Sequence, residues 1–363
     1  MRIFQNIGIY RNYEAKLLRL VESVSSYQKA MDIFIKDRYV SCHILKPIID
    51  ASSDAFLSLG STVRFQTLWA NSVGMPKSAT FVEILLAQIE HHRTEVFYNM
   101  DPIRFGDDFL KKLPGSVKYK IAWRAAPSPH LNFRNYDLLV NNFPNLRAIY
   151  NSKGFRTAHF FPAHDEHMNT FAKNENRPID ILFVGGYSQY HMKRADLLEC
   201  MATLSKEFNV LYHIDKSRLT SLADSPLGIL PVLRKYRTRK LIRQISSNGI
   251  FGLDLYEALS KSKITLNIAG EIAGVERGNM RCFEAMGCGS LLLSDAGKYP
   301  KGMIPGTNII TYRNPTEAVD LARSFLTVRP YHEIRELAKK GHQSILEAYS
   351  REKQWTAFQG LLK

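Results

Sequence analysis

Residues 276–295, which read ERGNMRCFEAMGCGSLLLSD, join a short helix to a strand of almost purely apolar character. Asn279 is a favoured residue at a helix N-terminus, and glycines such as Gly287 and Gly289 are typical of a helix end. The run Ser-Leu-Leu-Leu-Ser that follows is typical of a strand buried on both faces. A helix that leads directly into such a strand favours an α/β fold with parallel sheets.

The same alternation of strands and helices continues along the whole chain and predicts two Rossmann-like domains. Residues 1–172 form the first predicted domain, with strands at 3–10, 64–70, 95–99, 119–123, 138–140 and 159–161, and helices at 13–36, 40–57, 79–91 and 109–113. Residues 173–178 are polar and end in proline, which indicates a linker. The second predicted domain, residues 178–349, has strands at 181–184, 209–214, 263–268, 290–294 and 309–312. Its helices are expected at 191–206, at 253–260, from 279, from 316 and at 332–349, before a terminal helix at 352–362.

Length and composition agree with two folded domains and exclude several other classes of protein. The chain has 363 residues, of which 45% are hydrophobic and 23% charged, as in ordinary globular proteins. The four cysteines follow no zinc-binding spacing, and nothing in their pattern indicates an oxidising compartment. The first residues are too polar for a secretory signal, and no apolar run is long enough to span a bilayer. We therefore expect a cytoplasmic protein.

Two carboxylates, Glu276 and Glu284, are separated by seven intervening residues and lie on either side of the predicted helix start. The N–H groups at a helix N-terminus are free to bind a phosphate, and the helix dipole favours negative charge there. Carboxylates accept hydrogen bonds from sugar hydroxyls. This arrangement predicts a site for a nucleoside diphosphate that carries a sugar. A chance spacing of two unrelated glutamates is the structural alternative.

This segment resembles the glycosyltransferases of the two-Rossmann-domain architecture called GT-B. It is similar to the E-x7-E pattern of the retaining branch, here followed by Glu284-Ala285-Met286-Gly287-Cys288-Gly289. Within that branch the chain most resembles the spore-maturation-protein-like family, also through residues 180–198, 252–268, 136–140 and 150–155. It departs from the branch after the first glutamate, where Arg277-Gly278-Asn279 replaces the common Pro-Phe-Gly.

The resemblance implies a fold, a reaction and a set of partners. Two Rossmann-like domains would face each other across a cleft, with the acceptor on the first domain and the nucleotide sugar on the second. A helix formed by residues 350–363 would cross back to the first domain. The implied reaction moves a sugar from a nucleoside diphosphate sugar to a glycan or lipid-linked acceptor, with retention of anomeric configuration and without a metal or other cofactor.

Specific residues of the second domain follow as candidates for donor binding. Arg194 and Lys193 come after a predicted strand and a glycine turn at Gly185-Gly186, a place from which cations can reach a diphosphate. In the resembled family Glu284 would bind the ribose and Glu276 the donor sugar. Arg281 would either hold Glu284 in place or reach phosphate, and the loop 248–252 would lodge the base. The remaining candidates, Ile250, Gly252, Gly278, Asn279 and Met280, belong to that loop and to the helix start.

The first domain offers fewer candidates. His130 lies in a loop after a predicted strand and is the candidate for a histidine near the donor sugar, which retaining members of this class often carry; a loop histidine without a role is the alternative. His159, His164, Asp165, Glu166 and His167 cluster in sequence, but their spacing is not that of a helical metal motif. We expect no metal site there.

The formal net charge of +15 suggests an anionic partner, and much of it is concentrated in one segment. Residues 233–244 contain Arg234, Lys235, Arg237, Arg239, Lys240 and Arg243, with apolar residues between them. Such a pattern suits peripheral binding to the inner face of the cell membrane, and equally a solvated helix. Nucleic acid is not expected, because no aromatic stacking platform accompanies the charges.

Two further functions remain as alternatives to glycosyl transfer. A nucleotide-sugar epimerase would share the architecture, but it would need acid and base residues around the sugar. A non-catalytic basic protein that binds membrane or nucleic acid would explain the charge and leave residues 276–295 unexplained.

Overall fold

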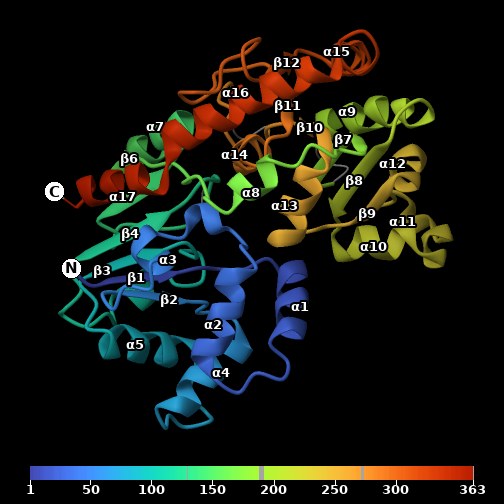
Figure 1. Cartoon of the computed structure of the whole chain (residues 1–363). Coiled ribbons are helices and arrows are strands. Elements are labelled where there is room, and N and C mark those ends of the chain that lie inside the picture. The colour runs from blue at the N-terminus through green and yellow to red at the C-terminus, as the bar shows by residue number, and fades with distance from the viewer. Residues whose placement is uncertain (129, 188–191, 271–273, 363) are drawn as a thin grey trace. The chain divides into compact units, whose positions relative to one another are not determined.

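The computed structural model describes residues 1–128, 130–187, 192–270 and 274–362. The chain divides into two compact units, which are coloured along the sequence in Figure 1: Met1–Ala163 with Arg351–Lys363, and His164–Ser350. Each unit contains one six-stranded sheet in which the pairings are parallel. The predicted α/β class with two Rossmann-like domains is therefore confirmed.

The first unit has the strand order β2-β1-β3-β4-β5-β6. Its central strands are short and buried, and Phe4, Phe97 and Leu139 contribute to one core with helices on both faces of the sheet (Figure 1). The strands are β1 (Ile3–Asn6), β2 (Ala55–Ser58), β3 (Val96–Asn99), β4 (Tyr119–Trp123), β5 (Leu138–Asn141) and β6 (Thr157–His159). The helices are α1 (Arg11–Leu20), α2 (Tyr27–Lys36), η1 (Ser41–His43), α3 (Lys46–Ile49), α4 (Val63–Ser72), α5 (Phe81–His91), α6 (Asp107–Leu110), α7 (Pro144–Ser152) and α17 (Arg351–Gly360).

Three predictions for the first unit are wrong. Residues 64–70 are not a strand but part of α4, because Phe65, Leu68 and Trp69 recur at helical spacing and bury one helix face. The helix predicted at 40–57 is only η1 and α3, followed by β2. The helix predicted at 13–36 is two helices, and Ser26 caps the second by accepting a bond from the N–H of Lys29.

The second unit has the strand order β12-β11-β10-β7-β8-β9. Its core includes Ile181 and Phe183 of β7, Leu266 of β10 and Leu293 of β11. The strands are β7 (Ile179–Gly186), β8 (Val210–Asp215), β9 (Ser246–Asn248), β10 (Ser262–Asn267), β11 (Leu291–Asp295) and β12 (Ile310–Tyr312). The helices are α8 (Met168–Ala172), α9 (Met192–Ala202), η2 (Thr203–Lys206), α10 (Arg218–Asp224), η3 (Pro226–Ile229), α11 (Pro231–Arg234), α12 (Lys240–Gln244), α13 (Leu253–Ser260), α14 (Met280–Gly287), α15 (Pro315–Thr327) and α16 (Tyr331–Tyr349).

Strands and helices of the second unit lie close to their predicted positions. Residue 191, where the first helix is predicted to begin, lies outside the described residues. The sequence did not predict α8 or β9 and gave no bounds for α10, η3, α11 and α12, because all of these elements are too short to carry a clear hydrophobic period.

The boundary between the units differs from the predicted linker at 173–178. The buried guanidinium of Arg177 donates to the carbonyls of Asn174, Leu259, Ser262 and Cys288, among others, so this segment is fixed within the second unit. Arg335 reinforces it by donating to the carbonyls of Ala172 and Gly289 and by pairing with Glu175. The chain therefore leaves the first unit at Ala163, before α8.

The chain returns to the first unit at Arg351, at the start of α17. This arginine is 2% exposed and donates to the carbonyls of Ser41 and Ile44. Phe358 of the same helix is buried and its ring contacts that of Tyr98. Residues 351–360 therefore belong to the core of the first unit.

Candidate functional site

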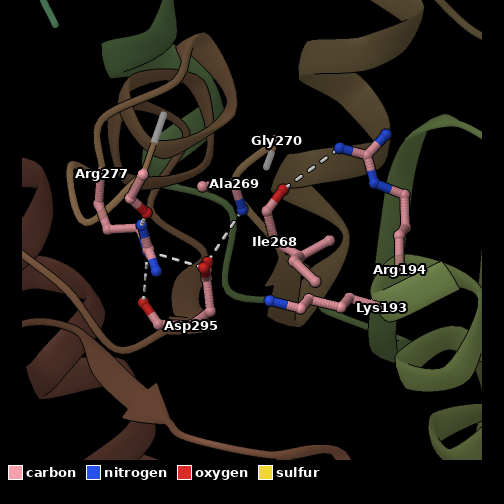
Figure 2. A pocket seen from close by; sticks show the side chains of 8 residues that line it. Lys193, Arg194, Ile268, Ala269, Gly270, Arg277 and Asp295 are labelled. Atoms are coloured by element: carbon pink, nitrogen blue, oxygen red, sulfur yellow. Dashed lines mark hydrogen bonds and ion pairs between the residues drawn. The ribbon is translucent and has the colours of Figure 1, made fainter. Parts of the chain in front are cut away.

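The sheet of the second unit has a switch point between β7 and β10. The connections from β7 lead to β8 and β9 on one side, and the chain then continues on the other side of β7 with β10, β11 and β12. Parallel α/β sheets bind ligands at such a point, outside the carboxyl ends of the strands. A pocket of about 340 Å³ lies there and is lined by Lys193, Arg194, Ile268, Ala269, Gly270, Gly274, Arg277 and Asp295 (Figure 2).

Asp295, at the carboxyl end of β11, organises the floor of this pocket. One carboxylate oxygen accepts a hydrogen bond from the backbone N–H of Ala269 at 2.9 Å. The other oxygen forms an ion pair with Nε of Arg277 at 2.7 Å, and both side chains are largely buried. Asp295 therefore ties the end of β10 to the loop before α14, as Figure 2 shows.

The guanidinium of Arg277 also donates hydrogen bonds to backbone carbonyls. It donates to the carbonyl oxygens of Gly274, Glu276 and Ala296 at 2.7–2.9 Å. The loop approaches residue 297 so closely that a Cβ there would lie 2.6 Å from the carbonyl oxygen of Val275, which only glycine avoids. Arg277 thus fixes the loop that precedes α14, and the Pro-Phe-Gly of the resembled branch is replaced by an arginine anchor.

The two cations at the start of α9 are held differently. Arg194 donates to the carbonyls of Gly186 at 3.0 Å and Ile268 at 3.5 Å, and so joins the ends of β7 and β10. Lys193 is exposed and makes no ion pair with the residues that the structure describes. Lys193 is therefore the more available of the two for an anionic ligand.

Gly185 and Gly186 were predicted to form a turn, and this prediction is wrong. Both residues belong to β7, where they pair with Ile214 and Asp215 of β8. A Cβ on Gly185 would lie 3.0 Å from the ring of Phe183, so packing explains the absence of a side chain there.

Asn279 occupies the N-cap position of α14, but its side chain does not cap the helix. It exchanges two hydrogen bonds with the amide of Asn267, at the end of β10, at 2.9 and 3.0 Å. The first-turn N–H groups of α14 are consequently left without this side-chain acceptor, which favours an anion at that helix end.

Glu284 and Arg281 form an ion pair on α14, with 2.7 Å between Nη1 and Oε2. Arg281 also donates to the carbonyl of Val184 in β7, so the pair lies against the end of that strand. Burial raises the pKa of Glu284, and the neighbouring guanidinium opposes this shift only in part. Of the two roles considered for Arg281, the geometry favours holding Glu284 in place.

Glu276 is half-buried in the loop before α14 and makes no ion pair with the described residues. Its backbone forms a bridge with Lys298. Gly278 follows with φ of 115°, a conformation that favours glycine, and half-buried Met280 begins the helix. Residue 273 of this loop lies outside the described residues.

The loop predicted to lodge a base follows β9 at the same edge of the sheet. Gly252, with φ of 62°, is the N-cap of α13, and Ile250 is half-buried. The imidazole of His213 contacts the carbonyl of Asn248 at 3.0 Å. No contact of Ile250 with the pocket residues is seen in the described part of the chain.

In the first unit, His130 is exposed and lies seven residues beyond β4.

The sequence did not identify Asp101, which follows β3 at the switch point between β1 and β3. Its carboxylate lies 3.5 Å from the hydroxyl of Ser61, and a Cβ on Gly8 would lie 3.0 Å from it. Burial raises the pKa of Asp101, and Arg104 opposes the shift. The rule that ligands bind at strand ends could have found this residue.

Two members of the sequence cluster at 159–167, His164 and Asp165, are buried and hydrogen-bonded within the fold. Nε2 of His164 contacts the amide oxygen of Asn169 at 2.8 Å, and Asp165 accepts a bond from the hydroxyl of Tyr256. Among the described residues, no group of three or more histidine, cysteine or acidic side chains is arranged to hold a metal.

Arg277 and Asp295 were also missed as site residues. In the sequence, Asp295 directly follows a predicted buried strand. The rule that ligands bind at the carboxyl ends of parallel strands could have identified it. Nothing in the sequence distinguishes Arg277, because its function depends on carbonyls from residues up to 19 positions away.

Comparison with known proteins agrees with this geometry. Residues 198–360 match a family described as glycosyl transferase-like. No curated protein matches the sequence. Many solved structures match the chain, and three of them represent the likeness. Anabaena Alr3699/HepE, in complex with UDP and glucose, has 13% identity, a TM-score of 0.59 and coverage of 100% of this chain and 99% of that chain.

The other two structures have similar scores. AviGT4, a glycosyltransferase involved in avilamycin A biosynthesis, has 13% identity, a TM-score of 0.53 and coverage of 90% and 88%. A UDP-forming trehalose-phosphate synthase from Burkholderia xenovorans has 9% identity, a TM-score of 0.53 and coverage of 99% and 98%. At such identities the likeness shows the fold, which is GT-B. The fold and the family match together support a glycosyltransferase.

Proposed function

We propose that the protein transfers a sugar from a nucleoside diphosphate sugar, with UDP as the first candidate, to a glycan or lipid-linked acceptor. The observation that carries the proposal is the pocket at the β7/β10 switch point, lined by Lys193 and by Arg277 of the loop that leads into α14. The similar fold of Anabaena HepE, crystallised with UDP and with UDP-glucose, supports the choice of nucleotide.

The chemistry needs stabilisation of a diphosphate as its negative charge grows in the transition state. Lys193 supplies a positive charge at the pocket, and the helix end supplies N–H donors and the positive end of a dipole. Diphosphate is already a fair leaving group, so these groups can take the place of a general acid. Glu284, held by Arg281, is proposed to accept the ribose hydroxyls.

The finer features of the reaction rest on the E-x7-E resemblance. We propose retention of anomeric configuration, with Glu276 as the residue that orients the donor sugar. The narrower similarity to spore-maturation-protein-like glycosyltransferases belongs to the same proposal. Asp101 and His130 are candidates in the first unit for contact with the acceptor or the donor sugar. The reaction is proposed to need no metal.

The location of the protein is part of the proposal. Among the described residues, no helix combines the length and the apolar character needed to cross a bilayer. We propose a cytoplasmic enzyme that acts at the inner face of the membrane, with no role for nucleic acid.

Nucleotide-dependent thermal stabilisation tests the donor site. UDP or GDP should raise the melting temperature of the wild type, and Glu284→Gln should weaken this stabilisation, because a lost charge-assisted hydrogen bond costs about 1.5–3 kcal/mol. Glu333→Gln is the control, because Glu333 is an exposed glutamate of α16 that pairs with Arg329 in the connection before that helix. Equal stabilisation of the wild type and Glu284→Gln would remove Glu284 from the site.

Product analysis tests the reaction itself. A nucleotide sugar incubated with an acceptor should give a product of retained configuration by NMR, and excess EDTA should leave the rate unchanged. Glu276→Ala should lower kcat more than nucleotide affinity. A change of the sugar without transfer would favour the epimerase. An inverted product would reject the retaining mechanism, and a loss of rate restored by a divalent cation would reject the metal-free one.

A further inference from the structure

The connection between β8 and β9 carries exposed apolar side chains at unusual density. Twenty large hydrophobic side chains are exposed among the described residues, and six of them fall within residues 219–232. We call these six the apolar corner: Leu219, Leu222, Leu227, Ile229, Leu230 and Val232. Ile229 and Val232 are each 73% exposed. Single exposed apolar residues need no explanation, but a cluster indicates a binding surface.

The apolar corner is carried by ordered backbone. It is formed by α10, η3 and α11, which contact one another and lie together in Figure 1. Asp224 fixes the segment by pairing with Lys216 at 2.8 Å and by accepting bonds from the N–H and hydroxyl of Thr238. A Cβ on Gly228 would lie 1.8 Å from the carbonyl of Ala223, so this glycine allows η3 to contact α10 directly. The apolar side chains are therefore presented by a fixed scaffold.

Basic residues flank this surface along the chain. Arg218, Arg234, Lys235 and Arg237 are exposed and form what we call the basic rim. Asp224 is the acidic residue of the segment, and its carboxylate is already satisfied by Lys216 and Thr238. Residues that flank the apolar corner thus carry uncompensated positive charge.

The sequence suggested that the basic residues of 233–244 bind a membrane, and the structure shows that one of them, Arg239, is held by ion pairs within the fold. Arg239 is paired with Asp196 at 2.9 Å and with Glu199, both on α9, and so it attaches the start of α12 to that helix. It has a structural role and belongs to neither the apolar corner nor the basic rim. The basic segment is also not one continuous helix, because α11 ends at Arg234 and α12 begins at Lys240.

We propose that the apolar corner and the basic rim form a docking surface for a membrane that contains anionic lipids. Apolar side chains that enter the boundary between headgroups and acyl chains, flanked by arginine and lysine, match such an interface. A second copy of this chain is disfavoured as the occupant, because two basic rims would repel each other. The proposal does not depend on glycosyl transfer, since it concerns a different surface of the second unit.

Vesicle binding tests the docking surface. The full-length protein should co-sediment with vesicles of phosphatidylcholine and phosphatidylglycerol, and less with phosphatidylcholine alone. Ile229→Ser with Val232→Ser should weaken binding to anionic vesicles about tenfold or more, because two exposed apolar side chains no longer enter the interface. Arg234→Gln, Lys235→Gln and Arg237→Gln together should weaken it by at least as much and reduce its dependence on salt.

Matched variants elsewhere separate this surface from general hydrophobicity and charge. Val328→Ser removes a side chain that is 77% exposed on another part of the second unit. Lys29→Gln, Lys77→Gln and Lys153→Gln remove the same number of exposed charges from the first unit. Neither control should change vesicle binding. Stabilisation by UDP, measured on every variant, shows whether the donor site is intact.

Several results would overturn the proposal. They are the absence of wild-type binding to anionic vesicles, equal binding to neutral vesicles, or equal loss in the control variants. Sedimentation that shows a dimer disrupted by Ile229→Ser and Val232→Ser would assign the surface to self-association instead. If UDP does not stabilise the wild-type protein but the protein still binds anionic vesicles, the result would count against the proposed function and leave the docking surface supported.

Discussion

Lys193 and Arg194 are adjacent in sequence, but their partners give them different roles at the pocket. The guanidinium of Arg194 donates to two strand-end carbonyls, whereas the ammonium of Lys193 is exposed at the pocket. The sequence favoured Arg194 as the phosphate ligand because guanidinium binds phosphate in bidentate fashion. The sequence could not show that this guanidinium already donates hydrogen bonds to a carbonyl of β7 and to the carbonyl of the residue after β10.

We expect Lys193→Gln to weaken nucleotide binding by about tenfold or more with little change in melting temperature, because a hydrogen bond to a charged group contributes about 1.5–3 kcal/mol. Arg194→Lys should instead lower the melting temperature, since two backbone carbonyls lose their donor at about 0.5–1.5 kcal/mol each. Calorimetric titration with UDP and thermal unfolding measure the two effects. The opposite pattern would assign phosphate binding to Arg194.

Residue-scale prediction from sequence was most successful where a role depends on neighbours in the chain. Arg281 was expected either to hold Glu284 in place or to reach phosphate, and the two side chains form an ion pair. Asn279 was expected as an N-cap, and its position is correct, but its amide binds Asn267 from β10. That contact joins residues 12 positions apart, and local sequence rules do not describe it.

At the scale of elements, buried strands of the second unit were predicted well. β10 and β11 lie within one residue of their expected positions, because each is buried along nearly its whole length. In the first unit, β4 lies at its expected position although it is only partly buried. α4 was mistaken for a strand because its seven predicted residues are too few to separate a period of 3.6 from a period of 2. The candidate site depends mainly on the ends of well-predicted strands.

The loop before α14 supplies an element-scale prediction. Gly297→Ala should weaken UDP binding although residue 297 does not line the pocket, because a Cβ would collide with Val275 and Arg277 and displace the loop. Gly115→Ala is the control, since nothing lies within 4 Å of a Cβ there. Affinity is measured by calorimetric titration. Unchanged affinity in Gly297→Ala would show that the loop does not contribute to nucleotide binding.

At the scale of the whole molecule, the candidate binding pocket lies in one unit, and two buried histidines that make stability depend on pH lie in the other. Every residue that lines the pocket belongs to the second unit. Two buried histidines belong to the first unit. Burial lowers the pKa of His43 to about 3, and burial together with nearby Arg2 lowers that of His92 to about 4. The sequence predicted neither, because both shifts arise from burial in the folded unit.

These histidines make the first unit sensitive to acid. In the folded state both pKa values lie below the unfolded value of about 6.5, so stability is complete above pH 6.5. Below it the unfolded chain binds protons that the folded chain does not. The free energy of unfolding should then fall by about 1.4 kcal/mol per pH unit for each histidine, until pH 4 for His92 and pH 3 for His43.

His92→Phe tests this expectation, because the ring of His92 lies near those of Phe4 and Phe56 and an aromatic replacement suits the site. Urea unfolding at several pH values should show a slope between pH 6 and pH 4 that is reduced by about 1.4 kcal/mol per unit. His332→Gln, a change at an exposed histidine, serves as the control for replacing a histidine. If His92→Phe leaves the slope unchanged, His92 is protonated in the folded protein, and the acid sensitivity of the first unit has another origin.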